Sequence, residues 1–219
     1  MNYKRITLLC GHYGSGKTNV ALNMAYELKN MKKEVCIADL DIVNPYFRTK
    51  DSAKELEEKG IKLICSEYAG SNVDIPALPQ DMYYLTDNKE SFAVIDVGGD
   101  DRGALALGRI APAIVEEGNY ECLLVINMYR PLTPDAVSTL EVMKEIEAAS
   151  KIKFTGIVNN SNIGSQTTAR DVKKSFKFAD EVSKLSGLPI VVTSVDKRLY
   201  DSFKTEDNIL PLKLQEKIF

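Results

Sequence analysis

Residues Cys10 to Thr18 read C-G-H-Y-G-S-G-K-T, and they satisfy the pattern G-x-x-x-x-G-K-[ST] without a substitution. The apolar run from Ile6 to Cys10 leads into this stretch and predicts a strand, and a helical pattern of apolar residues begins directly after it. A glycine-rich loop between a strand and a helix is the local structure that binds phosphates through its backbone amides. The stretch therefore predicts a phosphate-binding loop.

Each residue type in this loop has a mechanical role. Glycines allow backbone dihedrals that are closed to residues with a β-carbon, so consecutive N–H groups can turn inward around an anion. The following helix directs its positive amino-terminal end at the same anion. We expect Lys17 to bridge the β- and γ-phosphates of a nucleotide and the Thr18 hydroxyl to bind Mg²⁺. The candidate phosphate-binding residues are Gly11, His12, Tyr13, Gly14, Ser15, Gly16, Lys17 and Thr18.

The length, charge and cysteine content restrict the possible protein classes. The 219 residues fit one domain, residues 1–219, and 28 basic against 31 acidic residues give a net charge of −3, which does not indicate a nucleic-acid surface. The apolar stretches are too short for a membrane span or a signal peptide, so we expect a cytoplasmic protein. The four cysteines form no C-x-x-C pair and His12 is the single histidine, which favours reduced core thiols over a metal or redox site.

Strand-like apolar runs alternate with helical patterns along the chain. This alternation predicts an α/β fold of the P-loop NTPase type, with a mostly parallel sheet of about seven strands and helices on both faces. The expected strands are residues 6–10, 35–40, 61–65, 92–97, 122–127, 154–159 and 190–193. Thr133 and Ser52 are expected to cap helices, Ser52 in a capping box with Glu55. The apolar residues from Leu210 to Phe219 are expected to dock on the core rather than on a membrane.

Carboxylates at the ends of two expected strands are candidates for holding Mg²⁺ beside the loop. Residues 92–96 form an apolar strand that closes on Asp96, as in a Walker B element, and the glycine pair at 98 and 99 can swing toward a γ-phosphate. Alternation along the strand places Asp39 and Asp41 on one side. We expect Asp39, Asp41 and Asp96 to surround the metal, with Asp41 also positioning the attacking water. The alternative is that Asp39 and Asp41 are surface carboxylates.

The chain resembles the deviant-Walker-A ATPases of the MinD/ParA/CobQ group, which includes the nitrogenase iron protein. Three motifs carry the resemblance: the phosphate-binding loop, the D-L-D of residues 39–41 and the V-I-D-V-G-G of residues 94–99. The similarity covers most of the chain. The resemblance implies that ATP and Mg²⁺ are the cofactors. It also implies that Lys17 and Asp41 are the catalytic residues, with Asp41 orienting the hydrolytic water.

The same resemblance implies an asparagine against the adenine amino edge, after a late strand. Asn160 is the better register and Asn159 the alternative, although both residues are also common turn formers. Guanine recognition normally uses N-K-x-D, but Asn127 is followed by Met-Tyr-Arg and Asn160 by Ser-Asn-Ile. The sequence therefore predicts ATP rather than GTP.

The chain departs from the family signature K-G-G-x-G-K-T at its first two positions, where it has His12 and Tyr13. In the family that first lysine reaches across a dimer to the phosphates of the partner subunit. Three residues could replace its charge. They are His12, if the phosphates protonate it, Arg48 in the stretch 41–51 after the second expected strand, and Arg102 at the end of the stretch 98–102 after the fourth. The alternative is that His12 only packs beside Tyr13.

These features predict a Mg²⁺-dependent ATPase that acts as a nucleotide switch, either by forming a nucleotide-dependent homodimer or by binding an unidentified protein partner. Three other functions stay open. They are an ATP-dependent synthetase of the dethiobiotin or cobyrinic-acid amidation type, a metal-insertion ATPase acting on a metalloenzyme, and an ATP-binding adaptor that does not hydrolyse its ligand. Residues 66–80 have no assigned role.

Overall fold

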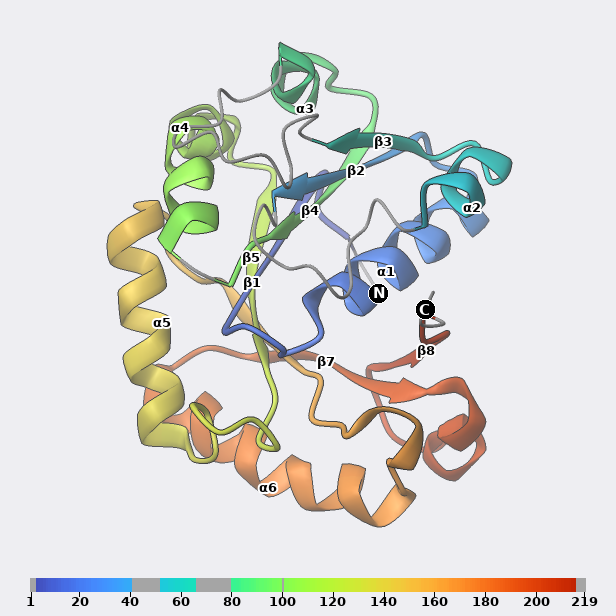
Figure 1. The fold of residues 1–219 in the computed structure, drawn as a ribbon, viewed down its shortest axis with the longest axis vertical. Helices are drawn as coiled ribbons and strands as arrows, with labels where there is room; N and C mark the ends of the chain where they lie inside the picture. Colours follow the sequence, from blue (N-terminus) through green and yellow to red (C-terminus); the bar gives the residue numbers. More distant parts are fainter. Residues whose placement is uncertain (1–2, 41–51, 66–79, 100, 216–219) are drawn as a thin grey trace.

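A parallel sheet runs through the middle of the molecule (Figure 1), and the described residues contribute eight strands to it. The structure is a computed structural model that describes residues 3–40, 52–65, 80–99 and 101–215, without the side chains of residues 80, 81, 101 and 102. The strands are β1 Ile6–Cys10, β2 Val35–Leu40, β3 Lys62–Cys65, β4 Phe92–Val97, β5 Tyr120–Ile126, β6 Gly156–Asn159, β7 Ile190–Asp196 and β8 Ile209–Leu212. Their order is β3-β2-β4-β1-β5-β6-β7-β8, and each neighbouring pair is parallel.

Helices cover both faces of this sheet, as the sequence predicts. They are α1 Lys17–Asn30, α2 Ala53–Glu58, α3 Tyr84–Asp87, α4 Asp101–Glu117, α5 Ala136–Ser150 and α6 Ala169–Ser186, with the short 3₁₀ helices η2 Gln80–Tyr83, η3 Gly164–Gln166 and η4 Lys197–Phe203. One apolar core lies between the sheet and α4, α5 and α6, and a second lies between the sheet and α1. The predicted α/β architecture is confirmed, and its parallel strands join through helical crossovers.

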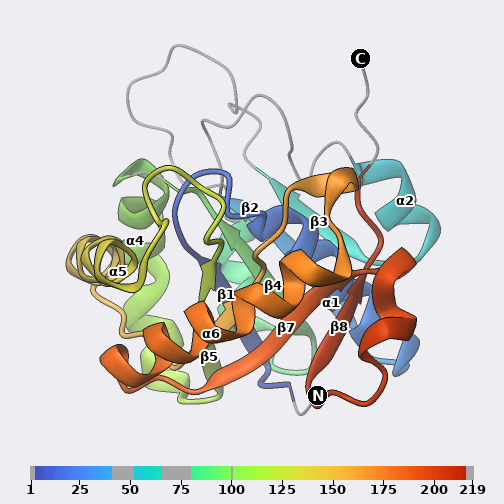
Figure 2. The same cartoon turned by 90° about the horizontal axis from the view of Figure 1, so that it is seen from below.

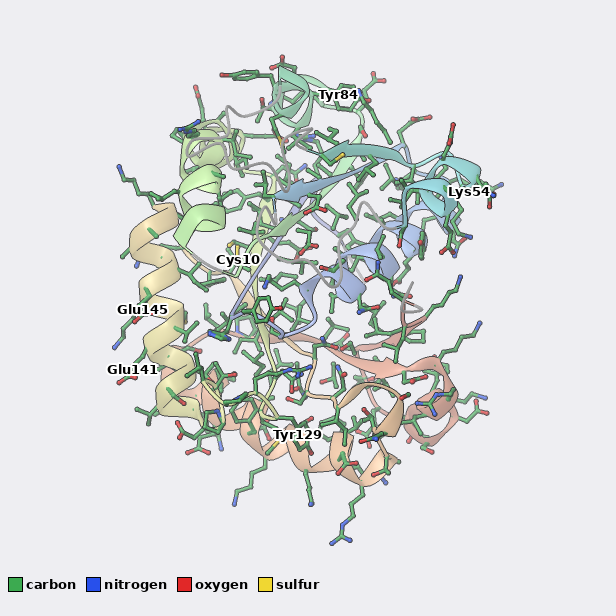
Figure 3. All side chains as sticks on the ribbon, in the orientation of Figure 1. Cys10, Lys54, Tyr84, Tyr129, Glu141 and Glu145 are labelled. Carbon is green, nitrogen blue, oxygen red and sulfur yellow. The ribbon has the colours of Figure 1, made fainter. Side chains whose placement is uncertain are left out.

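The central strands are buried on both faces because apolar side chains alternate between the two cores. In β1, Leu8 and Cys10 enter the core under α4 and α5, and Leu9 enters the core under α1. Cys10 lies inside the molecule, whereas Glu141 and Glu145 extend away from it on α5 (Figure 3). The middle of the sheet thus holds the end of β1 in a fixed place.

The eighth strand was not predicted as a strand. Residues 209–212 pair in parallel with β7, with Thr193 opposite Ile209 and Asp196 opposite Leu212. The expectation that the tail docks on the core is correct for this segment, since Leu210 and Leu212 belong to the core under α1. Pro211 is tolerated because β8 is an edge strand, whose outer side needs no backbone donor.

The predicted cap at Thr133 is wrong, and the one at Ser52 is right in position but lacks the capping box. The cap of α5 is Asp135, whose side chain accepts a hydrogen bond from the Ser138 amide at 2.9 Å, while the Thr133 hydroxyl donates to the Asn127 carbonyl at 3.1 Å. Ser52 precedes α2 without a side-chain cap bond. The capping box fails there because Glu55 instead accepts from Lys213 Nζ at 2.9 Å.

No disulfide joins the cysteines of the described residues. Cys10, Cys36 and Cys122 are buried, and the Sγ atoms of Cys10 and Cys122 lie 4.0 Å apart. Burial raises the pKa of the Cys36 thiol, which keeps it in its unreactive protonated form. In the part of the chain that the structure describes, no group of three or more His, Cys, Asp or Glu side chains is placed to hold a metal ion, and no helix is long and apolar enough to cross a membrane.

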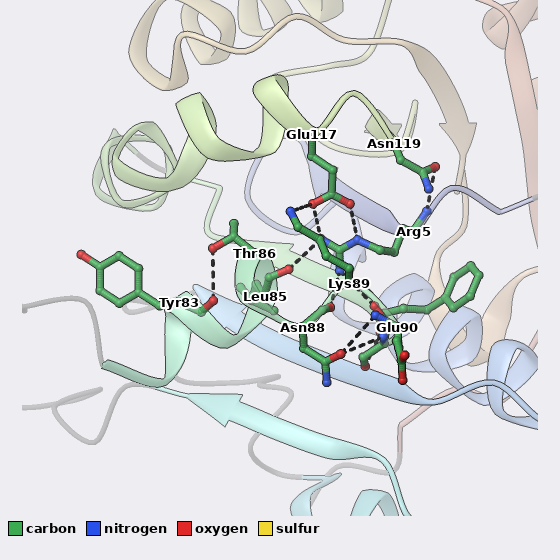
Figure 4. Close-up of polar contacts among 11 residues, drawn as sticks. Arg5, Tyr83, Leu85, Thr86, Asn88, Lys89, Glu90, Glu117 and Asn119 are labelled. Atoms are coloured by element: carbon green, nitrogen blue, oxygen red, sulfur yellow. Dashed lines mark hydrogen bonds and ion pairs between the residues drawn. The ribbon is translucent and has the colours of Figure 1, made fainter.

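A buried arginine links the amino-terminal ends of the central strands to α4 (Figure 4). The Arg5 guanidinium donates to the Glu117 carboxylate and to the carbonyls of Leu85 at 2.8 Å, Asn88 at 3.0 Å and Ser91 at 3.0 Å. Lys89 Nζ lies 2.7 Å from the same carboxylate. The hydrogen bond from Arg5 holds the pKa of Glu117 below its ordinary value. One side chain thus joins α3, the turn before β4 and the last turn of α4.

Candidate nucleotide-binding site

The loop after β1 leads into α1 through Gly16, a cap residue that has no side chain. Gly16 occupies the cap position with φ 89°, a left-handed conformation that favours glycine, and it supplies no side-chain acceptor. The longer helices α5 and α6 differ, since Asp135 and Thr168 accept hydrogen bonds from their first-turn amides. The cap residue of α1 thus supplies no acceptor to its first amides, and the helix dipole favours a negative charge there.

Lys17 is buried beside this loop. Its ammonium donates to the carbonyl of Gly11 at 3.0 Å and lies 3.3 Å from the carbonyl of His12. Thr18 is equally buried, in the first turn of α1. The two residues that the motif assigns to phosphate and Mg²⁺ thus sit together at the junction of loop and helix.

Two of the predicted carboxylates stand side by side on neighbouring strands. Asp39 of β2 is directly opposite Asp96 of β4, and Asp96 is opposite Leu9 at the end of β1. By the alternation of side chains, both acids belong to the face of the sheet that α1 covers, together with Val94 and Ile37. Both are largely buried, so the alternative of exposed surface carboxylates is wrong for Asp39. Asp41 lies outside the described residues.

The segment after β4 contacts the loop closely. A β-carbon built on Gly99 would lie 2.6 Å from the amide nitrogen of Tyr13 and 2.9 Å from Lys17 Nζ. A β-carbon on Gly103, in the first turn of α4, would lie 2.6 Å from Gly98 Cα. Only glycine fits at either position, and a displacement of residues 98–99 would press directly on both the loop and α4.

Asn160 and Asn159 point to different parts of the molecule. The Asn160 amide donates to the carbonyl of Ser15 in the loop at 2.6 Å, and its oxygen accepts from Asn162 Nδ2 at 3.0 Å. The Asn159 amide donates to Ser175 Oγ on α6 at 2.9 Å. Asn160 is therefore the residue that touches the phosphate-binding loop, while its contact with adenine stays a prediction.

A small pocket of about 10 Å³, enough for about one water molecule, lies between the segment after β6, the end of β7 and strand β8. Its lining includes Asn162, Gly164, Thr167, Ser194 and Asp196. Asn162 and Ser194 both hydrogen-bond to the Asn160 oxygen, which links the pocket to the loop. The loops after β1, β5 and β6 lie on the same side of the molecule, opposite the amino terminus (Figure 2).

The residues proposed to replace the signature lysine are only partly described. His12 Nδ1 lies 2.9 Å from the carbonyl oxygen of Tyr13, so the ring is bound to the loop's own backbone. Arg48 and the Arg102 side chain lie outside the described residues. A further cation, which the sequence reasoning missed, lies on the loop: Arg130, after β5, is close to Gly14. Its position shortly after the strand β5, which neighbours β1, could have indicated that it lies near the loop.

Comparisons with known proteins identify the fold. No protein-family profile matches the chain, and no curated protein matches it. Cell division protein FtsY from Thermotoga maritima superimposes with a TM-score of 0.58 at 20% identity, over 87% of this chain and 61% of that one. Chloroplast FtsY from Physcomitrella patens gives 0.58 at 16%, over 88% and 59%. The fold is that of a P-loop NTPase.

A third structure with this fold is the signal recognition particle 54 kDa protein from Aeropyrum pernix, in complex with GDP. It gives a TM-score of 0.54 at 17% identity, over 88% of this chain and 41% of that one. The chain thus spans about 60% of the length of the FtsY structures and less of the 54 kDa protein. Identities at this level establish the P-loop NTPase fold alone.

Proposed function

We propose that this chain is a Mg²⁺-dependent ATPase that works as a nucleotide switch. Two observations support the proposal: Lys17 and Thr18 begin α1 directly after the glycine loop, and Asp39 and Asp96 lie opposite each other on the face of the sheet that α1 covers. Amides and an ammonium suit a polyphosphate, whereas a hydroxyl and carboxylates suit the water shell of Mg²⁺. Lys17 would bind the phosphates, Thr18 the metal, and Asp39 and Asp96 its bound waters.

The same proposal assigns a path from nucleotide to partner. Residues 98–99 meet the loop on one side and the first turn of α4 on the other. A γ-phosphate that moves these glycines would therefore move α4, and α4 would alter a surface used for homodimer or partner contacts. A synthetase would release phosphate only with its second substrate, so phosphate release with Mg²⁺-ATP alone distinguishes the switch from it.

We propose that the base lies beside Asn160 and that the base is adenine. The position of the guanine-binding acid of N-K-x-D, three residues after Asn160, is occupied by Ile163. Without that acid, the ring nitrogen and amino group of guanine would lack a hydrogen-bond acceptor. Adenine does not need this acceptor, so its binding would not be weakened. Guanine nucleotides are the second candidate, because the 54 kDa neighbour is a complex with GDP.

Titration calorimetry of the chain with Mg²⁺-ATP and Mg²⁺-GTP tests this choice. We expect ATP to bind at least about ten-fold more tightly than GTP. Measuring ADP and GDP in the same series separates recognition of the base from recognition of the γ-phosphate. A preference for both guanine nucleotides would contradict the assignment to adenine and leave the phosphate site standing.

Turnover tests the role of Asp41. We expect Asp41→Ala to bind Mg²⁺-ATP as the parent chain does and to lose most phosphate release at saturating ATP, because the residue would position water rather than hold the nucleotide. Asp180→Ala, an exposed acid on α6, is the matched control. Unchanged release by Asp41→Ala would remove the proposed role, and a parent chain that binds ATP without releasing phosphate would be the non-hydrolysing adaptor.

A further inference from the structure

The loop after β5 places an arginine against the phosphate-binding loop. A β-carbon built on Gly14 would lie 3.6 Å from Arg130 Nε, 3.7 Å from Arg130 Cδ and 3.9 Å from Arg130 Cζ. These are ordinary van der Waals distances. A β-carbon at residue 14 would therefore just touch the guanidinium end of Arg130. Because residue 14 is a glycine, that end of Arg130 comes close to the loop backbone itself.

The backbone of Arg130 is held rigidly. Its amide donates to the Asn127 carbonyl at 3.2 Å, and its carbonyl accepts from the Thr133 amide at 3.1 Å. The Asn127 side chain is buried and donates to the Asn162 carbonyl at 3.1 Å, in the segment that also holds Asn160. The segment after β6 therefore contacts both the turn that carries Arg130, through Asn162, and the phosphate-binding loop, through Asn160.

The Arg130 guanidinium carries an unused donor. Its Nε is buried and has no hydrogen-bond partner within the described residues. The guanidinium groups of Arg5 and Arg198, by contrast, bind carboxylates and carbonyls. A buried N–H without an acceptor costs free energy, and such groups in folded proteins commonly await an ion or a ligand. An anion at the loop would supply the missing acceptor.

We propose that Arg130 binds a phosphate oxygen of the nucleotide, as a second cation beside Lys17 that the same chain supplies. This inference rests on the proposed function. A planar guanidinium fork fits phosphate oxygens better than a point charge does, and its contact with Gly14 places it at the rim of the loop. His12 differs from Arg130 in that its Nδ1 lies 2.9 Å from the Tyr13 carbonyl oxygen, a partner within the loop itself.

Two substitutions and two probes test the proposal. Arg130→Ala removes the side chain, and Arg130→Met keeps an aliphatic stem against Gly14 without the charge. We expect each variant to lose about ten- to hundred-fold in affinity for Mg²⁺-ATP and for inorganic tripolyphosphate, which has no base or ribose. The melting temperature without ligand should stay unchanged, because Nε has no partner among the described residues to lose. Arg109→Ala, at an exposed position of α4, is the control.

The outcomes separate this inference from the function on which it rests. Retained affinity for both probes in Arg130→Met would overturn the role of Arg130 while leaving the nucleotide site intact. A lower melting temperature with retained affinity would make Arg130 a structural residue and would overturn the proposal in the same way. If the parent chain bound neither Mg²⁺-ATP nor tripolyphosphate, the proposed function itself would fail.

Discussion

Lys17→Ala should lose about a hundred-fold or more in affinity for Mg²⁺-ATP. The ammonium is buried beside the loop and lies within hydrogen-bond distance of the carbonyls of Gly11 and His12. On nucleotide binding it can bind phosphate oxygens, where the attraction between opposite charges adds to the hydrogen bond. The measurement is titration calorimetry with Mg²⁺-ATP.

A matched control makes the loss interpretable. Lys173→Ala removes the same type of side chain from an exposed position of α6 and should bind ATP as the parent chain does. Circular dichroism of both variants checks that they fold. Normal affinity in folded Lys17→Ala would mean that the loop is not the phosphate site, and the proposed function would fall with it.

Arg5→Met should lower the free energy of unfolding by about 3–5 kcal/mol, the usual cost of breaking a buried ion pair from one side. The Arg5 side chain is 5% exposed and donates to the Glu117 carboxylate and to three carbonyls from the segment before β4. Methionine keeps the stem and removes every one of these donors, so the acceptors stay buried without them. Urea denaturation measures the loss.

The control for this prediction is Arg109→Met, which changes an exposed arginine of α4 and should stay within about 0.5 kcal/mol of the parent chain. A loss of less than 1 kcal/mol in the free energy of unfolding of Arg5→Met would contradict a stabilising role for the Arg5 hydrogen bonds drawn in Figure 4. An arginine at the surface would give the same small loss.

The difference between the parent chain and Arg5→Met should depend on pH. Because Arg5 holds the pKa of Glu117 below its ordinary value of 4.5, the unfolded state binds more protons than the folded state in acid. This part of the stabilisation is fully present above pH 4.5 and is lost as pH falls through the lower pKa of the folded protein. The two urea curves should therefore approach each other as the pH is taken below 4.5.

The fold could be predicted from the sequence where the patterns were long and regular. The alternation of buried runs with helical stripes predicted the α/β sheet, and β1, β2 and β4 have the predicted bounds. The strand β8 was missed because four residues that include Pro211 carry almost no periodic signal. The position of β8 depends on its pairing with β7, and no pattern in the sequence indicates that pairing.

The errors at helix ends and in the site have the same origin. Thr133 and Asp135 are both good capping residues, and the choice depends on the distant Asn127 carbonyl that takes the Thr133 hydroxyl. Glu55 was drawn away from the predicted capping box by Lys213, a partner remote in sequence. Arg130 could not be assigned because its approach to Gly14 follows only from β5 lying beside β1.

A crystal structure of the chain with Mg²⁺ and a non-hydrolysable ATP analogue would show whether the loop and the two carboxylates form one site. We expect the phosphates on the amides before α1, with Lys17 on the β- and γ-phosphates, Mg²⁺ on the Thr18 hydroxyl, and Asp39 and Asp96 facing the metal through its waters. A nucleotide bound away from residues 11–18, or a metal remote from both carboxylates, would contradict this expectation.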